Sequence, residues 1–533
     1  MEQKIMGMPK LSLFFFLLLV FTLTIGGKTN MNFVEGKQPI QTIVVLVLEN
    51  RSFDHILGWM KSVNPSIDGV TGRECNPIST KSKSSKSICF TDDAVYVDPN
   101  PGHDFPDVKQ QIFGSGTTPS MSGFVEQAIS ISKNVSDVVM KGFKPVSVPV
   151  YAELVREFAV FNRWFSSVPG PTQPNRLFVY SATSSGATYH DKVQLAKGYP
   201  QKTIFDSLYE DNIDFGIYYD HVPATLFYRN LRQLKYILRF HRYGTKFKKH
   251  AKEGKLPNLT VIEPRYYDIF GNPANDDHPS HDVGNGQKLV KEVYEALRAS
   301  PQWNQTLFVI TYDEHGGFFD HVPTPIHNVP NPDGKISPPP NFFKFDQLGV
   351  RVPTIMISPW IKKGTVVGRA KGPEISSEYE HSSIPATIKK MFNLSSDFLT
   401  RRDAWAGTFE HIVGELDSPR TDCPSNINNF TYLLMTLPEP PSLRGSEPDE
   451  NREVSEFQTE LTDLARSLIK DDYNLMNSKM GNEKKMTVKE GEQYVREAMS
   501  KFLKASKDTL RLGIDGSTIV DLTTCNHDKE WAC

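Results

Sequence analysis

Two pairs of oxygen-bearing side chains follow apolar runs in this sequence. Glu49 and Asn50 come at the end of the run at residues 40–48, and Asp313 and Glu314 come just after the run at residues 307–311. Burial of a carboxylate is costly unless a cation lies beside it, because desolvation disfavours the charged form. Carboxylate and amide oxygens suit a hard or borderline divalent ion. The four residues therefore predict a metal site, and the alternative is that the acids only cap strands and form salt bridges.

Thr172 is the candidate nucleophile. It lies between Pro171 and Pro174, just before an apolar run at residues 177–182. This pattern is typical of a helix N-cap, where free N–H groups and the helix dipole favour an anion. An unactivated hydroxyl is a poor nucleophile at neutral pH, but coordination to a metal can lower its pKa. Taken alone, Thr172 predicts only a cap.

Histidines near acids supply candidate proton donors. A nearby carboxylate can orient an imidazole and raise its pKa, as general acid catalysis requires. Five histidines in turn-like segments have such a neighbour: His103, His221 (after Asp220), His278, His281 and His381. For each of them, an ordinary surface or core role is the alternative. His315 and His321 lie inside the acidic motif and their roles stay open.

The elements that must position these residues are strands of an α/β domain. The runs at residues 40–48, 307–311 and 352–357 are rich in β-branched residues and predict strands buried on both faces, hence parallel. Helix-like patterns such as residues 286–299 lie between them. This alternation predicts one large α/β domain with a mostly parallel sheet. Ligands of such sheets bind beyond the carboxyl ends of the strands, where the candidate residues are found.

Composition excludes some classes of protein. The chain has 533 residues, of which 38% are hydrophobic and 23% charged, as in a soluble globular protein. Lys and Arg number 60 against 62 Asp and Glu, so the formal net charge is -2. That balance gives no global field to attract nucleic acid, and we expect no nucleic-acid partner.

The N-terminus predicts export. An apolar run at residues 11–25 follows Lys4 and Lys10 and precedes Gly26 and Gly27. The run is shorter than the roughly 20 residues of a spanning helix, and the small residues after it suit a signal peptidase. We expect a signal peptide at residues 1–26, a location outside the cell or in the secretory-pathway lumen, and no transmembrane segment in the mature chain. An uncleaved anchor is the alternative.

Cysteines and glycosylation motifs agree with an oxidising compartment. Cys75 and Cys89 enclose a loop rich in Ser and Lys and are predicted to pair, which leaves Cys423, Cys525 and Cys533 with one unpaired. Weak sequons occur at Asn134, Asn258, Asn304, Asn393 and Asn429. Asn50 also heads a sequon, but we expect no glycan there because the residue should end a buried strand.

The last part of the chain has a different composition. Residues 418–450 are rich in Pro, Ser and Asn and predict a linker or wrapped loop. Residues 453–469 and 487–507 predict two amphipathic helices, the second opened by a capping box of Thr487 and Glu490. We therefore expect a catalytic domain at residues 38–417 and a C-terminal helical region at residues 451–533.

Residues 229–252 form a strongly basic segment. Nine Lys and Arg residues occur there, with no Asp or Glu between Asp220 and Glu253. Six of them step by three and four residues, which predicts a basic amphipathic helix. Such a helix could lie on a phospholipid membrane surface as a peripheral contact. The alternative is a solvated helix docked by its leucines, and Gly244 could break it midway.

Five motifs together carry a resemblance to a known family. ENRSFDH, TQPNR, DDHPSHD, YDEHGGFFDHVPTP and EHSSIPATIKKMF, between residues 49 and 392, resemble the phosphoesterase family of plant non-specific phospholipases C. That family is related to bacterial phospholipases C and an acid phosphatase. The resemblance implies an alkaline-phosphatase-like three-layer α/β/α sandwich. It also implies hydrolysis of phosphatidylcholine or phosphatidylethanolamine to diacylglycerol and a phospho-headgroup.

The resemblance assigns roles to individual residues. It implies a divalent metal ion, without a requirement for calcium, held by Glu49, Asn50, Thr172, Asp313 and Glu314. Thr172 would be the nucleophile, and His103, Asp220, His221 and His278 would contact the phosphoryl oxygens or the leaving group. Bacterial relatives often have Ser in place of Thr172, and Asn-Asp in place of His315-Gly316. Two other functions stay open: a phosphomonoesterase with the same site, and a non-catalytic lipid-binding protein.

Overall fold

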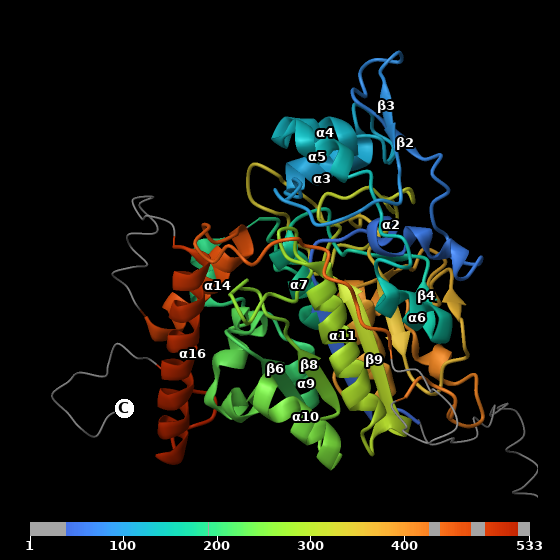
Figure 1. Ribbon diagram of the computed structural model, residues 1–533. Coiled ribbons are helices and arrows are strands. Elements are labelled where there is room, and N and C mark those ends of the chain that lie inside the picture. Colours follow the sequence, from blue (N-terminus) through green and yellow to red (C-terminus); the bar gives the residue numbers. More distant parts are fainter. Residues whose placement is uncertain (1–38, 190, 426–436, 471–485, 521–533) are drawn as a thin grey trace, which may run out of the picture. The chain divides into compact units, whose positions relative to one another are not determined.

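The computed structural model describes residues 39–189, 191–425, 437–470 and 486–520 (Figure 1). These residues belong to one compact unit that begins at Pro39. The predicted signal peptide, Asn429, Cys525 and Cys533 lie outside the described residues. The boundaries at residues 417 and 450 therefore stay predictions, since the two sides pack within the same unit.

An eight-stranded sheet forms the centre of the unit, in the order β11-β4-β10-β9-β1-β8-β6-β7. β1 runs parallel to β8 and β9, and β6 runs parallel to β7 and β8. The predicted α/β class with a mostly parallel sheet is confirmed. The strands are β1 (Thr42–Leu48), β4 (Ala159–Phe161), β6 (Phe215–Tyr219), β7 (Phe240–Arg242), β8 (Leu259–Ile262), β9 (Thr306–Tyr312), β10 (Thr354–Ile357) and β11 (Val366–Val367).

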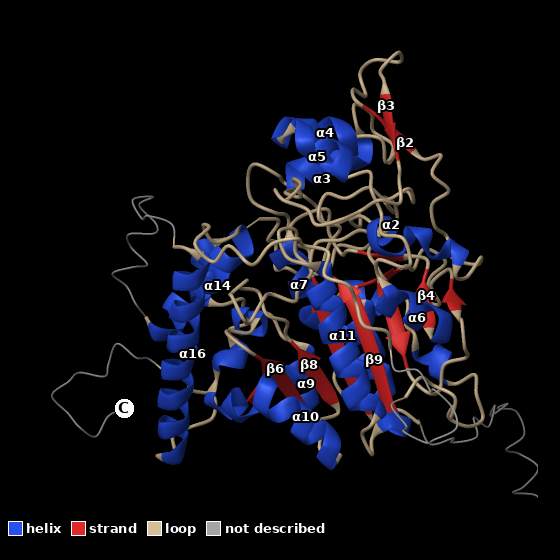
Figure 2. Ribbon diagram, in the orientation of Figure 1, coloured by secondary structure: helices blue, strands red, loops and turns tan. Residues whose placement is uncertain are grey.

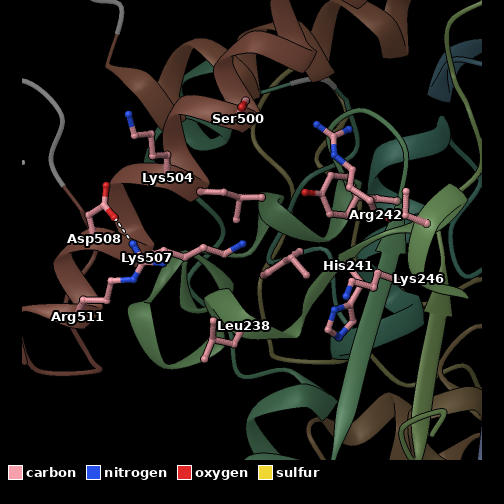
Figure 3. Close-up of a pocket in the computed structure, with 13 residues that line it drawn as sticks. Leu238, His241, Arg242, Lys246, Ser500, Lys504, Lys507, Asp508 and Arg511 are labelled. Atoms are coloured by element: carbon pink, nitrogen blue, oxygen red, sulfur yellow. Dashed lines mark hydrogen bonds and ion pairs between the residues drawn. The ribbon is translucent and has the colours of Figure 1, made fainter. Parts of the chain in front are cut away.

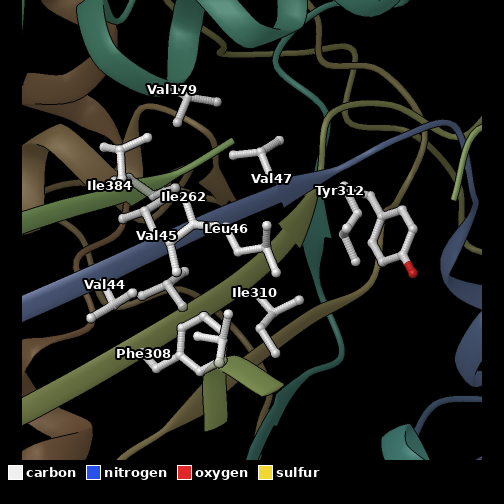
Figure 4. Packing of buried hydrophobic residues seen from close by; sticks show 14 of the residues in the cluster. Val44, Val45, Leu46, Val47, Val179, Ile262, Phe308, Ile310, Tyr312 and Ile384 are labelled. Atoms are coloured by element: carbon white, nitrogen blue, oxygen red, sulfur yellow. The ribbon is translucent and has the colours of Figure 1, made fainter. Parts of the chain in front are cut away.

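Burial explains why the central strands are apolar throughout. All seven residues of β1 and all seven of β9 are buried. Their side chains pack with Val179 and Ile384 from the helices above them (Figure 4). β10 is also a buried strand, but it runs antiparallel to β9 and β4, so its predicted parallel orientation was wrong. Burial on both faces fixes only that a strand is covered, and says nothing of its direction.

Two groups of helices cover the sheet (Figures 1 and 2). α6 and α10 contact α11 in one group, and α7, α9 and α12 contact one another in the other. These are α6 (Pro149–Glu157), α7 (Thr172–Ser181), α9 (Ile204–Glu210), α10 (Tyr243–Glu253), α11 (Val283–Arg298) and α12 (Ser383–Met391). The helix predicted at residues 286–299 is confirmed as α11. Shorter elements include α2 (Phe53–Leu57), α8 (Lys192–Lys197), α13 (Arg401–Trp405), β5 (Trp164–Phe165) and β12 (Tyr379–Glu380).

A small subdomain with its own apolar core follows β1. It holds α3 (Phe105–Phe113), α4 (Phe124–Ile131), α5 (Lys133–Val138) and the hairpin of β2 (Cys75–Pro77) and β3 (Ser87–Cys89). The predicted disulfide between Cys75 and Cys89 is confirmed, and it joins the two strands of that hairpin. Cys423 is buried and has no disulfide partner among the described residues, which do not include Cys525 and Cys533.

Two C-terminal helices pack on the rest of the unit. α14 (Glu456–Ile469) contacts α8, and α16 (Val488–Arg511) contacts α14 and the short 3-10 helix η4 (Leu234–Arg239). The predicted capping box of Thr487 and Glu490 is confirmed at the start of α16. No helix in the described part of the chain has the length and apolar character needed to cross a bilayer.

The predicted amphipathic helix at residues 229–252 was wrong. The segment forms η3 (Asn230–Arg232), η4, strand β7 and only then helix α10. Arg232, expected on the exposed stripe, is buried and donates to the carbonyls of Leu195, Ala196 and Leu226 at 2.8–2.9 Å. Three well-placed carbonyl acceptors from other segments satisfy the guanidinium inside the protein, an outcome that periodicity cannot reveal.

Candidate active site

The four predicted oxygen ligands meet at one edge of the sheet. Glu49 and Asn50 follow β1, Asp313 and Glu314 follow β9, and the two strands are adjacent and parallel. All four side chains are buried. The Asn50 backbone N–H donates to Asp313 Oδ1 at 3.1 Å. The structure thus brings together residues that lie 263 positions apart in the sequence.

Tight backbone packing holds the two strand ends together. Asn50 has a φ of 57°, and the next residue, Arg51, donates from its N–H to the Glu314 carbonyl at 3.1 Å. Gly316 lies against Asn50 with a φ of 65°, and a Cβ added to it would be 2.0 Å from the Asn50 carbonyl oxygen. Only glycine fits this position, because any side chain would displace the Asn50 backbone.

Thr172 is the first residue of α7 and points at Asn50. Its Oγ1 donates to Asn50 Oδ1 at 3.1 Å. Pro171, not Thr172, occupies the N-cap position, so the predicted N-cap role was wrong by one residue. Because Pro171 is the N-cap residue, the Thr172 hydroxyl does not cap the helix. The Asn175 side chain fixes the preceding turn, because it donates to the carbonyls of Gly170 and Pro171 at 3.0 and 3.2 Å.

Arg176, the last residue of the TQPNR motif, also belongs to the site, although the sequence predicted no role for it. Its Nη2 lies 3.0 Å from Glu49 Oε1 and its Nε lies 2.9 Å from Asp313 Oδ2. It therefore ties the two strand ends to α7. The signal that could have found it is spacing: Arg176 is four residues after Thr172, on the same face of a helix.

The buried acids carry more negative charge than Arg176 can balance. Burial raises the pKa of Glu49 well above its usual value, with Arg176 opposing the shift and Asp276 adding to it. Burial likewise raises the pKa of Asp313 to about 7, against the effect of Arg176. Glu314 Oε1 and Asp276 Oδ2 are buried with no hydrogen-bond partner among the described residues. Buried carboxylate oxygens without a hydrogen-bond partner fit a divalent cation.

Two of the predicted histidines lie beside this cluster. His103 Nε2 is 3.3 Å from Asn50 Nδ2, and the His103 and His278 rings are 6.4 Å apart. Burial lowers the pKa of His103, but Glu314 and the Pro101 carbonyl outweigh burial, so the pKa is raised. Burial lowers the pKa of His278 well below its usual value. His281 Nδ1 lies 2.7 Å from Asp276 Oδ1, which connects the turn of the DDHPSHD motif to the site.

Asp220 and His221 are placed elsewhere. They follow β6, where Asp220 lies 3.5 Å from Arg265 and His221 Nε2 lies 3.3 Å from Glu492 of α16. Both line a polar cavity of about 410 Å³. Within the described residues, no hydrogen bond, ion pair or ring contact joins either of them to Thr172 or its neighbours. Their predicted role at the phosphoryl group stays a prediction.

Two of the remaining motif histidines position the acids. His315 Nδ1 lies 3.2 Å from Glu314 Oε2, and its Nε2 lies 2.7 Å from Gln111 Oε1. His381 Nε2 lies 2.6 Å from the Asp313 carbonyl, and burial lowers the pKa of His381 to about 4. A neutral ring at that position donates to the Asp313 backbone and adds no charge to the site.

A separate cluster of Asp54, Asp320 and His321 has a geometry that could hold a metal ion. Arg351 already lies 2.9 Å from Asp54 and 3.0 Å from Asp320, and His321 Nδ1 lies 2.7 Å from Asp54. Burial lowers the pKa of His321, but its hydrogen bonds to Asp54 and Asp68 outweigh burial and raise the pKa to about 10. Two cations thus balance the two buried acids, and the cluster has less need of an ion than the site at Thr172.

Comparison with known proteins now identifies the family. A profile described as Phosphoesterase family matches residues 40–395. The chain belongs to this family. Non-specific phospholipase C6 of Arabidopsis thaliana is 66% identical over 501 residues, which cover 93% of this chain and 94% of that protein. Non-specific phospholipase C1 of the same plant is 54% identical over a region that covers 95% of this chain and 93% of that protein.

The proteins similar to this chain include a more distant bacterial phospholipase C. The non-hemolytic phospholipase C of Burkholderia pseudomallei is 24% identical over 78% of this chain and 63% of that protein. The predicted resemblance and the predicted class of enzyme, a phosphoric diester hydrolase, are confirmed. A solved alkaline phosphatase superfamily protein from Vibrio parahaemolyticus is 12% identical and covers 47% of this chain and 62% of its own, at a TM-score of 0.28.

Proposed function

We propose that this protein is a secreted phospholipase C that cleaves glycerophospholipids on the glycerol side of the phosphate. Its substrates would be phosphatidylcholine and phosphatidylethanolamine, and its products diacylglycerol and a phospho-headgroup. The observation that carries the proposal is the position of the Thr172 hydroxyl, 3.1 Å from Asn50 and at the strand ends that carry the buried acids. The predicted signal at residues 1–26 supports the location.

Glu49, Asn50, Thr172, Asp313 and Glu314 would hold a divalent metal ion, with no requirement for calcium. When bound, the ion would stabilise charge on the phosphoryl oxygens and lower the pKa of the Thr172 hydroxyl. Arg176 orients Glu49 and Asp313, because it bonds to both carboxylates, and it opposes the rise in their pKa values that burial causes. The start of α7 presents Thr172 toward this edge with its side chain free of the helix.

The chemistry is a double displacement at phosphorus. The Thr172 hydroxyl loses its proton to solvent, Thr172 Oγ1 forms a bond to phosphorus while the bond to the glycerol oxygen breaks, and a protonated His103 gives that oxygen its proton. His103 suits this step because its pKa is raised and it lies beside Asn50. Water then attacks the phosphothreonine and loses a proton to His103, while the bond from Thr172 Oγ1 to phosphorus breaks; Thr172 Oγ1 takes a proton from solvent and the phospho-headgroup is released.

A matched pair of substitutions tests the nucleophile. Thr172→Ala removes the hydroxyl, and we expect turnover of phosphatidylcholine to fall by about a thousandfold or more. Thr172→Ser keeps a hydroxyl and should retain far more activity, measured as diacylglycerol and phosphocholine released. Strong chelation should also inactivate the enzyme, and added divalent metal should restore it. An active Thr172→Ala variant would overturn the mechanism.

The same purified proteins separate the two rival functions. A phosphomonoesterase would hydrolyse a soluble phosphomonoester faster than phosphatidylcholine at equal enzyme concentration. A non-catalytic lipid-binding protein would release no headgroup, and Thr172→Ala would leave its lipid affinity unchanged.

A further inference from the structure

A pocket of about 480 Å³ lies between α16 and the segment from Leu238 to Lys246, apart from the residues around Thr172. Figure 3 shows Lys504, Lys507 and Arg511 on α16 at one side, and Arg242 and Lys246 at the other. Basic side chains thus come from two parts of the chain that are more than 250 residues apart. Only the folded structure shows that these two basic segments line one cavity. The sequence pattern had singled out the first segment alone.

The pocket has an excess of positive charge. Among the described residues that line it, Asp508 is the one acid, and it lies 2.9 Å from Arg511 and is paired with it. Lys246, Lys504 and Lys507 form no ion pair or hydrogen bond with any residue that the structure describes. The pKa of His241, also in the lining, is lowered to about 4 by burial and by the charges of His250, Lys246, Arg239 and Lys507. That shift agrees with a positive potential in the cavity.

Apolar side chains accompany these cations. Leu238 lines the pocket and is 60% exposed, and Leu503 also lines it. Directly after Arg511, Leu512 is 65% exposed and Ile514 is 45% exposed. Exposed leucines next to unpaired lysines fit a ligand that is anionic at one end and apolar at the other. A small anion free in solution would gain no binding free energy from these apolar side chains.

The two walls are fixed to each other. The chain that follows α16 returns to η4, where Leu234 N–H donates to the Thr518 carbonyl and Lys235 N–H donates to the Gly516 carbonyl, both at 2.9 Å. Phe502 of α16 is buried in the main core. A pocket with walls held in this way is formed before the ligand arrives, which lowers the entropy cost of binding.

We propose that this pocket binds the phosphomonoester headgroup of an anionic phospholipid and so holds the enzyme on a membrane. A phosphomonoester carries about 1.5 to 2 negative charges at neutral pH. Three lysines without acidic partners can match that charge better than they match the single charge of a diester. The inference rests on the proposed lipid substrate, because membrane contact matters only to an enzyme whose substrate lies there.

The test reverses three cations of the pocket and three elsewhere. One variant carries Lys246→Glu, Lys504→Glu and Lys507→Glu; the control carries Lys81→Glu, Lys83→Glu and Lys86→Glu, in the exposed loop closed by the Cys75–Cys89 disulfide. Both change the net charge equally. Binding is measured in a Thr172→Ala background on phosphatidylcholine vesicles that contain a minor fraction of phosphatidic acid. We expect the pocket variant to bind at least about tenfold more weakly, and the control to bind almost as the parent does.

Each further comparison decides one part of the proposal. Equal weakening in both variants would mean general surface attraction and would overturn the pocket. Equal binding to phosphatidylglycerol vesicles of matched charge would overturn the preference for a phosphomonoester. If inorganic phosphate binds the pocket as tightly as the vesicles do, the ligand is a soluble phosphate and the membrane role is wrong.

Turnover separates this proposal from the proposed function. With Thr172 intact, the pocket variant should hydrolyse soluble short-chain phosphatidylcholine at the parent rate and vesicle lipid more slowly. Loss on both substrates would mean a defect of folding or of the catalytic site and would contradict the separation of the two sites. If the parent has no turnover at all, the proposed function fails, while the binding result still decides the pocket.

Discussion

Arg176 connects the three parts of the proposed catalytic site. It bonds to Glu49 after β1 and Asp313 after β9, and it belongs to the same helix as Thr172. Its planar guanidinium can reach both carboxylates at once, which an ammonium group does poorly. Without this cation, the buried acids would repel one another and take up protons, because burial already raises their pKa values.

We therefore predict that Arg176→Gln lowers turnover by roughly 10- to 100-fold, as loss of a group that orients metal ligands does. Metal content, measured on the purified variant by elemental analysis, should fall with it. Arg176→Lys keeps the charge but not the two bonds and should be intermediate. Full metal content and full activity in Arg176→Gln would show that the acids need no such partner.

The residues of the site were predictable to different degrees. The four oxygen ligands could be found because carboxylates at the ends of buried strands are costly unless a cation lies beside them. They are Glu49, Asn50, Asp313 and Glu314. The role of Arg176 could not, since an i, i+4 pair on a helix is common and its partners are distant in sequence. Asp220 and His221 resembled the other acid–histidine pairs, yet they follow β6 and contact Arg265 and Glu492.

At the scale of elements, the contact between the turn after β9 and the end of β1 depends on a glycine. Gly316→Ala would place a methyl group 2.0 Å from the Asn50 carbonyl oxygen. Gly334 has a similar positive φ of 80°, but a Cβ there would meet no atom within 4 Å. The two glycines thus share the same backbone strain and differ in the collision.

This pair gives a direct prediction. Gly334→Ala should lower the free energy of unfolding by about 1 kcal/mol, the cost of the left-handed conformation. Gly316→Ala should cost about 1 to 3 kcal/mol more and should reduce turnover, because the Asn50 backbone must move. Chemical denaturation and an activity assay on both variants check this. Equal losses would mean that the collision relaxes freely.

Elements were predicted where one pattern sufficed. β1 and β9 are continuous apolar runs, and α11 and α16 have a clear helical period, so all four were found. The segment at residues 229–252 also has a helical period, but the Arg232 side chain donates hydrogen bonds to the carbonyls of residues 195, 196 and 226. Tertiary hydrogen bonds outweighed the local pattern there, and the sequence carries no local sign of them.

At the scale of the whole molecule, the C-terminal region is built into the site. Phe457, at the start of α14, lies under the Arg176 guanidinium at 5.3 Å and packs on the Tyr266 ring at 5.2 Å. The next residue, Gln458, donates to the Tyr266 carbonyl at 2.6 Å and accepts from the Tyr267 hydroxyl at 3.0 Å. The helix therefore braces the residue that orients the proposed metal ligands.

The consequence can be tested within α14 itself. Phe457→Ala and Leu468→Ala both remove buried apolar side chains, and each should lower the free energy of unfolding by about 2 to 5 kcal/mol. Leu468 lies 11 residues further along the helix, about 16 Å away. Only Phe457→Ala should also lower turnover per folded molecule, by about tenfold, because Arg176 loses its support. Turnover of a soluble short-chain lipid, measured well below both melting temperatures, checks this; equal turnover in the two variants would mean that the C-terminal region stabilises the fold and leaves the site unaffected.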